Sequence, residues 1–287
     1  MEEQKWKGES RGNALGYNIF IWLIKNLGLY SAYFMLLFVT TYFVLFSRKT
    51  NKEIYRFYRE ALHFSRFKSI VYIWKNYYQM GQTLIDKAAI FSGKSKEFTL
   101  VKPNYDNLLA MIQEDKPSVF IMSHVGNFEA AGFLVDLKKR VNLLTYEAEL
   151  AHIKKIMDDL KEDGLFKSFT IKYDGSHIFE LQSVMEKKEI LCLHGDRYLE
   201  GTKTITADFF GKPARFTYGP FYLADRFNAN AAIVSLVKSG MKEYTLEHRR
   251  LDTSKGQQDI ANQYAKHLES FVKKYPESWF NYYDFWA

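Results

Sequence analysis

The chain has 287 residues, and its 40 Lys and Arg residues against 33 Asp and Glu residues give a net charge of +7. With five Pro, 16 Gly and 17% aromatic residues, the composition excludes a collagen-like or low-complexity chain. A single cysteine, Cys192, excludes a disulfide scaffold, a cysteine-based zinc cluster and a CxxC redox site. These features predict a folded, aromatic-rich protein with a reduced thiol.

An uncharged apolar segment near the N-terminus, residues 27–46, has the sequence LGLYSAYFMLLFVTTYFVLF. About twenty apolar residues cover the hydrocarbon core of a bilayer. The segment that follows, residues 47–75, holds eight Lys and Arg residues against two Glu, which is nearly all of the excess charge. Cationic residues beside an apolar helix mark the cytoplasmic face and attract anionic headgroups. We therefore expect a membrane anchor, either spanning or interfacial, with the remaining chain held at the cytoplasmic side; a buried core helix is the alternative.

Beyond the anchor, the pattern predicts a helical region and then alternating strands and helices. Residues 51–91 have helical spacing of Tyr, Phe, Ile and Leu, and residues 92–98 form a break. Helices are predicted over 104–114, 127–138, 150–163, 176–187, 220–227 and 257–275. Strands are predicted over 117–122, 141–146, 189–193, 206–210, 232–237 and 244–251.

This alternation predicts a single α/β domain whose mostly parallel or mixed central sheet is flanked by helices. The apolar run VFIM in the first of these strands is typical of a central strand buried on both faces. The expected organisation is an anchor helix over residues 1–47 and an α/β domain over 48–287, whose residues 48–92 form a basic helical segment at the membrane surface.

The strongest candidate for chemistry is the segment SHVGNFE, residues 123–129, which follows that strand at the start of a helix. Reactive residues in such sheets tend to follow the carboxyl ends of strands. His124 would lie at the strand end and Glu129 in the first helical turn, where the carboxylate can fix the tautomer of a general base. Gly126 permits a close approach of backbone or substrate, and Asn127 is a candidate helix cap. The alternative is a structural histidine with Glu129 as a helix-start carboxylate.

A second strand end carries the sequence HGDR, residues 194–197, and is followed by DFFGKPARFTYGP, residues 208–220. Arg197 and Arg215 would bring guanidinium groups to the same rim, where they suit a phosphate or a carboxylate. Gly219 and Pro220 indicate the start of a helix. Surface ion pairs, such as Asp196 with Arg197, are the alternative interpretation.

Taken in order, SHVGNFE, HGDR, DFFGKPARFTYGP and the terminal PESWFNYYDFW resemble the sequence blocks of the bacterial late acyltransferases of lipid A biosynthesis. These enzymes belong to the HtrB-like lysophospholipid acyltransferase superfamily. The anchor and its basic continuation match as well, so the resemblance covers nearly the whole chain. The spacing of histidine, four residues and carboxylate, together with the FFG block, is the most specific part of it.

The resemblance implies a glycerolipid-acyltransferase-like fold at the bacterial inner membrane, with the catalytic domain on the cytoplasmic side. It implies acyl transfer from acyl-carrier protein or acyl-CoA to a hydroxyl, less often an amine, of a membrane lipid. His124 would be the general base, Glu129 its partner, and no metal, cofactor or covalent acyl-enzyme would be needed. By motif match or position, residues in the substrate-binding region would be Asn127, Asp196, Arg197, Arg215 and Gly219.

The sequence departs from the lipid A enzymes at three places. Phe128 replaces their usual tryptophan, LTYEA at 144–148 replaces a block that commonly carries arginine, and Tyr283-Asp284-Phe285 stands where basic residues are usual. The acceptor therefore stays open among lipid A-like lipids, amino-acid-headed lipids, glycolipids and pigment lipids.

Acyl-carrier protein is an expected partner because it is strongly acidic, and an anionic membrane surface is another. Candidate cations for these contacts are Arg56, Arg59, Arg66, Lys68 and Lys212. No nucleic-acid-binding motif is present in the sequence. Two other functions stay open: a metal-dependent hydrolase that uses His124 and His194 with nearby carboxylates, and a non-catalytic membrane adaptor.

Overall fold

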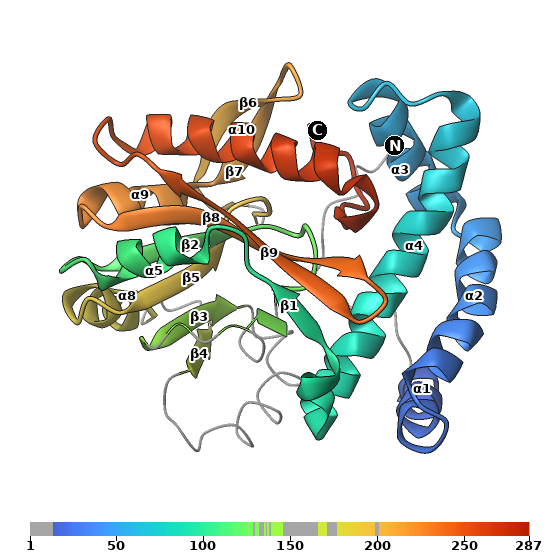
Figure 1. Ribbon diagram of the computed structural model, residues 1–287. Coiled ribbons are helices and arrows are strands. Elements are labelled where there is room, and N and C mark those ends of the chain that lie inside the picture. Colours follow the sequence, from blue (N-terminus) through green and yellow to red (C-terminus); the bar gives the residue numbers. More distant parts are fainter. Residues whose placement is uncertain are drawn as a thin grey trace.

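The predicted α/β fold is confirmed by the computed structural model, which describes residues 14–128, 130–131, 135, 137, 139–145, 166–170, 177–198 and 201–286. A seven-stranded sheet has the order β1-β9-β8-β2-β5-β3-β4 (Figure 1). Its strands are β1 (Thr99–Val101), β2 (Ser118–Met122), β3 (Val141–Thr145), β4 (Phe166–Thr170), β5 (Ile190–His194), β8 (Asn230–Gly240) and β9 (Glu243–Leu251). Every neighbouring pair is parallel except the β8–β9 hairpin.

The central strand β2 is a short apolar run that contributes to the cores on both faces of the sheet. All five of its residues are buried, and its side chains alternate between two cores on opposite faces. Val119 and Ile121 pack into one core, and Phe120 and Met122 pack into the other. Such a strand requires layers of helices on both sides.

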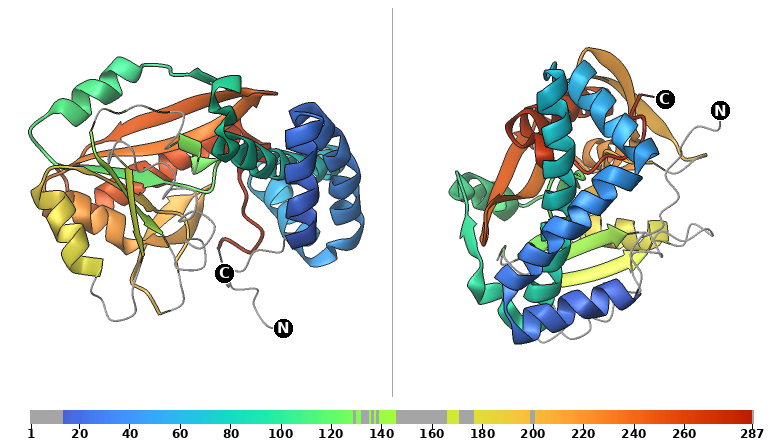
Figure 2. Two further views of the ribbon diagram at one scale, coloured as in Figure 1. Left: turned by 90° about the horizontal axis from the view of Figure 1, so that it is seen from below. Right: turned by 90° about the vertical axis from the view of Figure 1, so that its right-hand side faces the viewer.

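Helices from separate parts of the chain supply those layers, which Figure 2 shows from two further directions. Buried residues of α8 (His177–Glu186), α9 (Tyr218–Arg226) and α10 (Gln257–Lys274) belong to the core that contains Val119. Buried residues of α5 (Tyr105–Gln113) belong to the core that contains Phe120. A separate antiparallel hairpin of β6 (Thr204–Phe209) and β7 (Lys212–Thr217) packs against α10.

The N-terminal region forms a group of helices beside the sheet rather than a single anchor helix (Figure 1). The expected anchor is divided into α1 (Ala14–Asn26) and α2 (Leu29–Phe46) at Gly28, whose φ of +83° suits glycine. The predicted helical region 51–91 is likewise divided, into α3 (Arg48–Glu60) and α4 (Arg66–Ala89). Ser65 caps α4 by accepting a hydrogen bond from the Lys68 amide at 3.2 Å.

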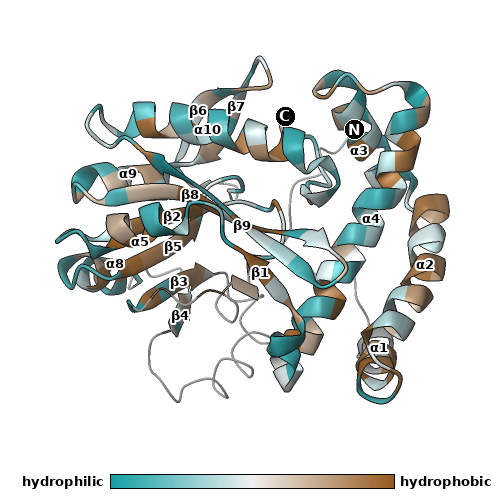
Figure 3. Ribbon diagram, viewed as in Figure 1, coloured by the Kyte–Doolittle hydropathy of each residue, from teal (hydrophilic) through white to brown (hydrophobic). Residues whose placement is uncertain are grey.

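An exposed apolar surface runs along α1 and α2, which Figure 3 colours largely as hydrophobic. Its members are more than 40% exposed: Ile19, Trp22, Leu27, Tyr30, Phe34, Met35, Phe38, Tyr42, Leu45 and Phe46. Within the described ranges, α2 is the one helix long and apolar enough to cross a membrane, and only 28% of it is buried. This exposure distinguishes α2 from a core helix and marks a surface for a membrane or a partner.

Apart from the helix predicted over 127–138, the remaining predicted elements agree with the structure to within about three residues wherever it describes them. Sequence patterns missed β1, β4 and β7, which are three-, five- and six-residue strands. β1 and β4 lie at the two edges of the sheet, and β7 lies in the separate hairpin and contains Pro213. The helix predicted over 150–163 lies outside the described residues. Half of the helix predicted over 127–138 is described, and there Ala130 and Ala131 are helical whereas Val135 and Leu137 are not.

Candidate active site

The loop that follows β2 is fixed by main-chain hydrogen bonds on two sides. The amide of Asn127 donates to the carbonyl of Leu236 in β8 at 2.7 Å. On the other side, the Gly126 amide donates to the Ser278 carbonyl at 2.9 Å, and the Phe280 amide donates to the His124 carbonyl at 3.0 Å. The loop is therefore held between a central strand and the C-terminal segment of the chain.

Gly126 is required in this loop for two independent reasons. Its φ is +86°, and a Cβ atom there would lie 2.2 Å from the carbonyl oxygen of Leu236. The first is a conformation that side chains with a Cβ rarely adopt, and the second is a collision with a backbone atom. The predicted close approach at Gly126 is thus an approach of backbone to backbone.

His124 pairs with Asp196, which follows the neighbouring strand β5. The His124 Nδ1 lies 2.8 Å from Asp196 Oδ1, and the His124 main-chain amide donates to Asp196 Oδ2 at 2.7 Å. The Asp196 side chain is 1% exposed and that of His124 is 14% exposed. A carboxylate that takes both contacts fixes the ring orientation and, because it is ionised, requires the proton on Nδ1.

The ionised state of Asp196 has an identifiable electrostatic cause. Burial favours the neutral acid, but the charge and hydrogen bond of His124 and the charge of Arg197 outweigh burial and lower the pKa of Asp196 well below its ordinary value. The carboxylate is thus available to stabilise an imidazolium on His124. This electrostatic arrangement is what a histidine general base needs.

A second imidazole lies against the first. The rings of His124 and His194 stack with centroids 4.6 Å apart, and Phe128 meets His194 edge-on at 4.2 Å. Burial, and then the neighbouring His124, lower the pKa of His194 well below its ordinary value. His194 is therefore neutral, and it packs as a flat wall beside His124.

Arg197 and Arg215, which were predicted to lie at the same rim of the site, contact different partners. The Arg197 guanidinium donates to the carbonyl of Phe280 in the C-terminal segment and lies 6.0 Å from the Tyr283 ring. Arg215 is exposed on β7, and its guanidinium lies 5.2 Å from the ring of Tyr198. Their predicted role in substrate binding stays a prediction.

The other predicted site residues lie in three different settings. Asn127 is 6% exposed, and its side-chain amide donates to the Thr83 carbonyl at 3.2 Å and to the Tyr244 hydroxyl at 3.3 Å. Gly219 lies in the first turn of α9 with open space where a Cβ would be. Glu129, predicted as the partner of His124, lies outside the described residues.

Sequence reasoning assigned Asp196 to the substrate-binding region, which stays a prediction, and it did not predict the contact of the Asp196 carboxylate with His124 that the structure shows. The signal for this contact is the sheet register. Met122 is paired with His194 across β2 and β5, so the residues two positions further on, His124 and Asp196, come side by side. The stacking of the His194 ring on His124 was not predicted either.

Two surface hollows lie away from this site. The larger, about 770 Å³, is lined by α5 and by residues that precede β2, β3 and β5, among them Glu114, Asp115, Lys139 and Lys188. The smaller, about 480 Å³, lies beside it and includes His248. In the part of the chain that the structure describes, no three His, Cys, Asp or Glu residues are arranged to hold a metal ion.

Replacing Gly126 with alanine is expected to lower the free energy of unfolding by at least about 2 kcal/mol. About 1–2 kcal/mol comes from the left-handed backbone and about 1–3 kcal/mol from the collision with Leu236. Gly211→Ala is the matched control, since Gly211 has a φ of +74° but open space around it. Denaturant unfolding in detergent measures both, and equal losses would contradict the steric argument.

The neutral His194, whose ring Nε2 atom is buried, predicts an acid-sensitive stability. The pKa of His194 is lowered in the folded protein. Below about pH 6.5 the unfolded chain therefore binds a proton at His194 that the folded chain does not bind. This stability is present above pH 6.5 and is lost as the pH falls, by up to about 1.4 kcal/mol per pH unit. Unfolding measured from pH 7.5 to 5.5 is expected to fall less steeply in His194→Gln. Exposed His63→Asn is the control and should keep the wild-type slope.

One protein family matches nearly the whole chain. The family model described as "Bacterial lipid A biosynthesis acyltransferase" matches residues 14–286. No curated protein matches the chain significantly. The family match includes the apolar helices, the loop with His124, the strand end with Asp196 and the C-terminal segment that contacts both. The chain belongs to the bacterial lipid A biosynthesis acyltransferase family.

Proposed function

We propose that this acyltransferase moves a fatty acyl chain from acyl-carrier protein or acyl-CoA to a hydroxyl or amine of a membrane lipid. The observation that carries the proposal is the pair formed by His124 and Asp196, 2.8 Å apart at neighbouring strand ends. A histidine whose Nδ1 proton is held by a buried carboxylate presents Nε2 as the basic atom. Family membership supplies the reaction class, and the pair supplies the base.

The proposed reaction is a direct attack within a ternary complex. His124 Nε2 takes the proton of the acceptor hydroxyl while the acceptor oxygen bonds to the thioester carbonyl carbon. The carbon–sulfur bond then breaks, and the departing thiolate receives the proton from the imidazolium. Asp196 stays ionised throughout and stabilises the positive charge on His124. The products are the acylated lipid and the free thiol of the carrier, so no proton is gained or lost.

The roles of the two carboxylates follow from different evidence. Asp196 contacts His124 directly, and we propose that it orients the ring. Glu129 is assigned to the same role by the spacing of the motif, and that assignment stays a prediction. Comparing Asp196→Asn with Glu129→Gln separates them, because loss of the orienting carboxylate is expected to reduce kcat by about 10²- to 10⁴-fold, the range of general base catalysis.

The acceptor is proposed as a lipid hydroxyl or amine, of a lipid A-like lipid or of an amino-acid or glycolipid. Two of the candidate cations are engaged within the protein: Arg56 pairs with Asp284, and Lys212 pairs with Glu60 at 2.9 Å. Asp284 stands in the block where basic residues are usual in the lipid A enzymes. This internal pairing favours an acceptor that carries less phosphate than bisphosphorylated lipid A.

We propose that the apolar surface of α1 and α2 holds the protein at the inner membrane, with the α/β domain on the cytoplasmic side. The exposed apolar residues lie along both helices, and the cation-rich α3 follows directly. Apolar area and cations together stabilise attachment to an anionic bilayer. A membrane position would also bring a lipid acceptor to the enzyme.

The proposed function predicts that His124→Ala abolishes acyl transfer. Membranes that contain the wild type or the variant would be incubated with labelled acyl-carrier protein or acyl-CoA and a total lipid extract of the host. Mass spectrometry then identifies any lipid that gains an acyl chain. A new acylated lipid is expected with the wild type, with or without EDTA, at a rate at least about 10²-fold above that of the variant.

His63→Asn, a replacement of an exposed histidine, is the matched control and should keep full activity. Activity that needs an added metal and is lost in EDTA would favour the hydrolase alternative instead. An unaltered acylation rate in His124→Ala would refute the proposed base. Absence of acylation by the wild type with either donor would favour the adaptor alternative.

The membrane proposal predicts that aspartates on α2 weaken attachment. Phe34 and Phe38 are 64% and 61% exposed, and burial of one such side chain contributes about 1.5–3 kcal/mol. The double variant Phe34→Asp/Phe38→Asp is expected to bind anionic vesicles at least about tenfold less well in co-sedimentation. Phe179→Asp is the control, because Phe179 is 76% exposed but lies on α8. Equal binding by the two variants would contradict the proposal.

A further inference from the structure

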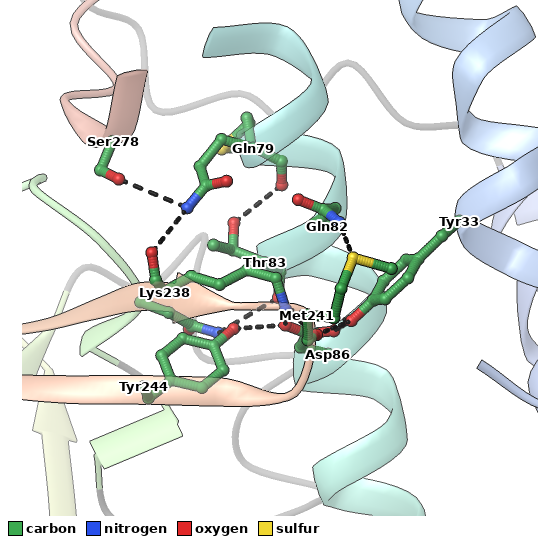
Figure 4. Close-up of polar contacts among 11 residues, drawn as sticks. Tyr33, Gln79, Gln82, Thr83, Asp86, Lys238, Met241, Tyr244 and Ser278 are labelled. Atoms are coloured by element: carbon green, nitrogen blue, oxygen red, sulfur yellow. Dashed lines mark hydrogen bonds and ion pairs between the residues drawn. The ribbon is translucent and has the colours of Figure 1, made fainter. Parts of the chain in front are cut away.

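A buried ion pair lies between the N-terminal helices and the sheet (Figure 4). Asp86 of α4 and Lys238 of β8 are 2.6 Å apart, and their side chains are 0% and 2% exposed. Two charges withdrawn from water are stable only if further hydrogen bonds complete their shells. The surroundings of this pair are therefore as informative as the pair itself.

Two tyrosines complete the shell of the carboxylate. The hydroxyl of Tyr33, from α2, donates to Asp86 Oδ1, and that of Tyr244, from β9, donates to Asp86 Oδ2 at 2.6 Å. Lys238 Nζ also donates to the Met241 carbonyl at 2.5 Å and to the Tyr33 hydroxyl at 3.1 Å. We call these four residues, Tyr33, Asp86, Lys238 and Tyr244, the Asp86 cluster; it joins α2, α4 and the β8–β9 hairpin (Figure 4).

One member of the cluster reaches the catalytic loop. Asn127 comes three residues after His124, and its side-chain amide donates to the Tyr244 hydroxyl at 3.3 Å. Because Tyr244 gives its own proton to Asp86, its oxygen can only accept from Asn127. The charge of Asp86 thus sets the direction of the hydrogen bond that reaches Asn127.

We propose that Tyr244, oriented by Asp86, is a positioning residue that holds the His124 loop through Asn127; this inference rests on the proposed role of His124. The Asn127 main-chain amide is bound to Leu236 and its side chain to Thr83 and Tyr244, so both ends of the residue are tied to the scaffold. A displacement of about 1 Å at a reacting group can reduce the rate by about 10²-fold. Loss of the hydrogen bond between Asn127 and Tyr244 is expected to lower the reaction rate more than it weakens substrate binding.

The cluster supplies its own matched control. Tyr33→Phe and Tyr244→Phe each remove one buried hydroxyl that donates to Asp86, and each keeps the ring. Only Tyr244 also accepts from Asn127. A general weakening of the cluster would affect both variants alike, whereas a positioning role separates them.

The test measures kcat, KM for the acyl donor and thermal unfolding in detergent for both variants. Tyr244→Phe is expected to lower kcat by about 5- to 30-fold with KM unchanged within about twofold, below the limit set by a full displacement of the loop. Tyr33→Phe should keep kcat within about twofold while losing as much thermal stability. Adding Tyr244→Phe to Asn127→Ala should reduce kcat no further, because both changes break one connection.

Equal kcat losses in the two tyrosine variants, or additive losses in the double variant with Asn127→Ala, would overturn the positioning role. His124→Ala is measured in the same assay to separate the two levels of the argument. If His124→Ala remains active, the proposed function fails and the positioning role fails with it. If His124→Ala is inactive while Tyr244→Phe behaves like Tyr33→Phe, only the positioning role fails.

Discussion

The carboxylate of Asp196 binds two strand ends into one site. One of its oxygens contacts the His124 ring and the other accepts from the His124 main-chain amide, so ring and backbone are fixed together. The contact is set by the register of β2 against β5, in which Met122 is paired with His194. A shift of the register by one residue would turn the side chains of one strand to the opposite face. The pair formed by His124 and Asp196 therefore depends on this register of the parallel sheet.

The loop with His124 is also where distant parts of the chain meet. The C-terminal segment bonds to it through Ser278 and Phe280, and β8 bonds to it through Leu236. Gln79 of α4 donates to the Lys238 carbonyl at 3.1 Å and approaches the Ser278 hydroxyl at 3.5 Å, so the helical group reaches the same region. The N-terminal helices are therefore part of the scaffold of the site, which is consistent with a family match that extends over residues 14–286.

Local patterns predicted the elements that bury long apolar runs, and failed where the structure depends on distant contacts. The run VFIM was enough to predict β2 and to place His124 in the loop that follows it. The edge strand β4, with the sequence FKSFT, lacks such a run, and the break at Gly28 depends on one backbone angle. The contact between His124 and Asp196 spans 72 residues and requires knowing that β2 and β5 are neighbours, whereas Glu129 is visible within one motif.

Net charge is a weaker guide to the acceptor than the positions of the charges. The sequence concentrates cations in residues 47–75, which suits anionic headgroups or an acidic carrier. In the structure Arg56 contacts both Glu53 and Asp284, so this cation also holds the C-terminal segment against α3. Lys68 lies 3.6 Å from the centre of the Phe64 ring. Since exposed ion pairs contribute little stability, these cations can exchange their internal partners for an anionic ligand, and we propose that internal carboxylates and lipid anions compete for them.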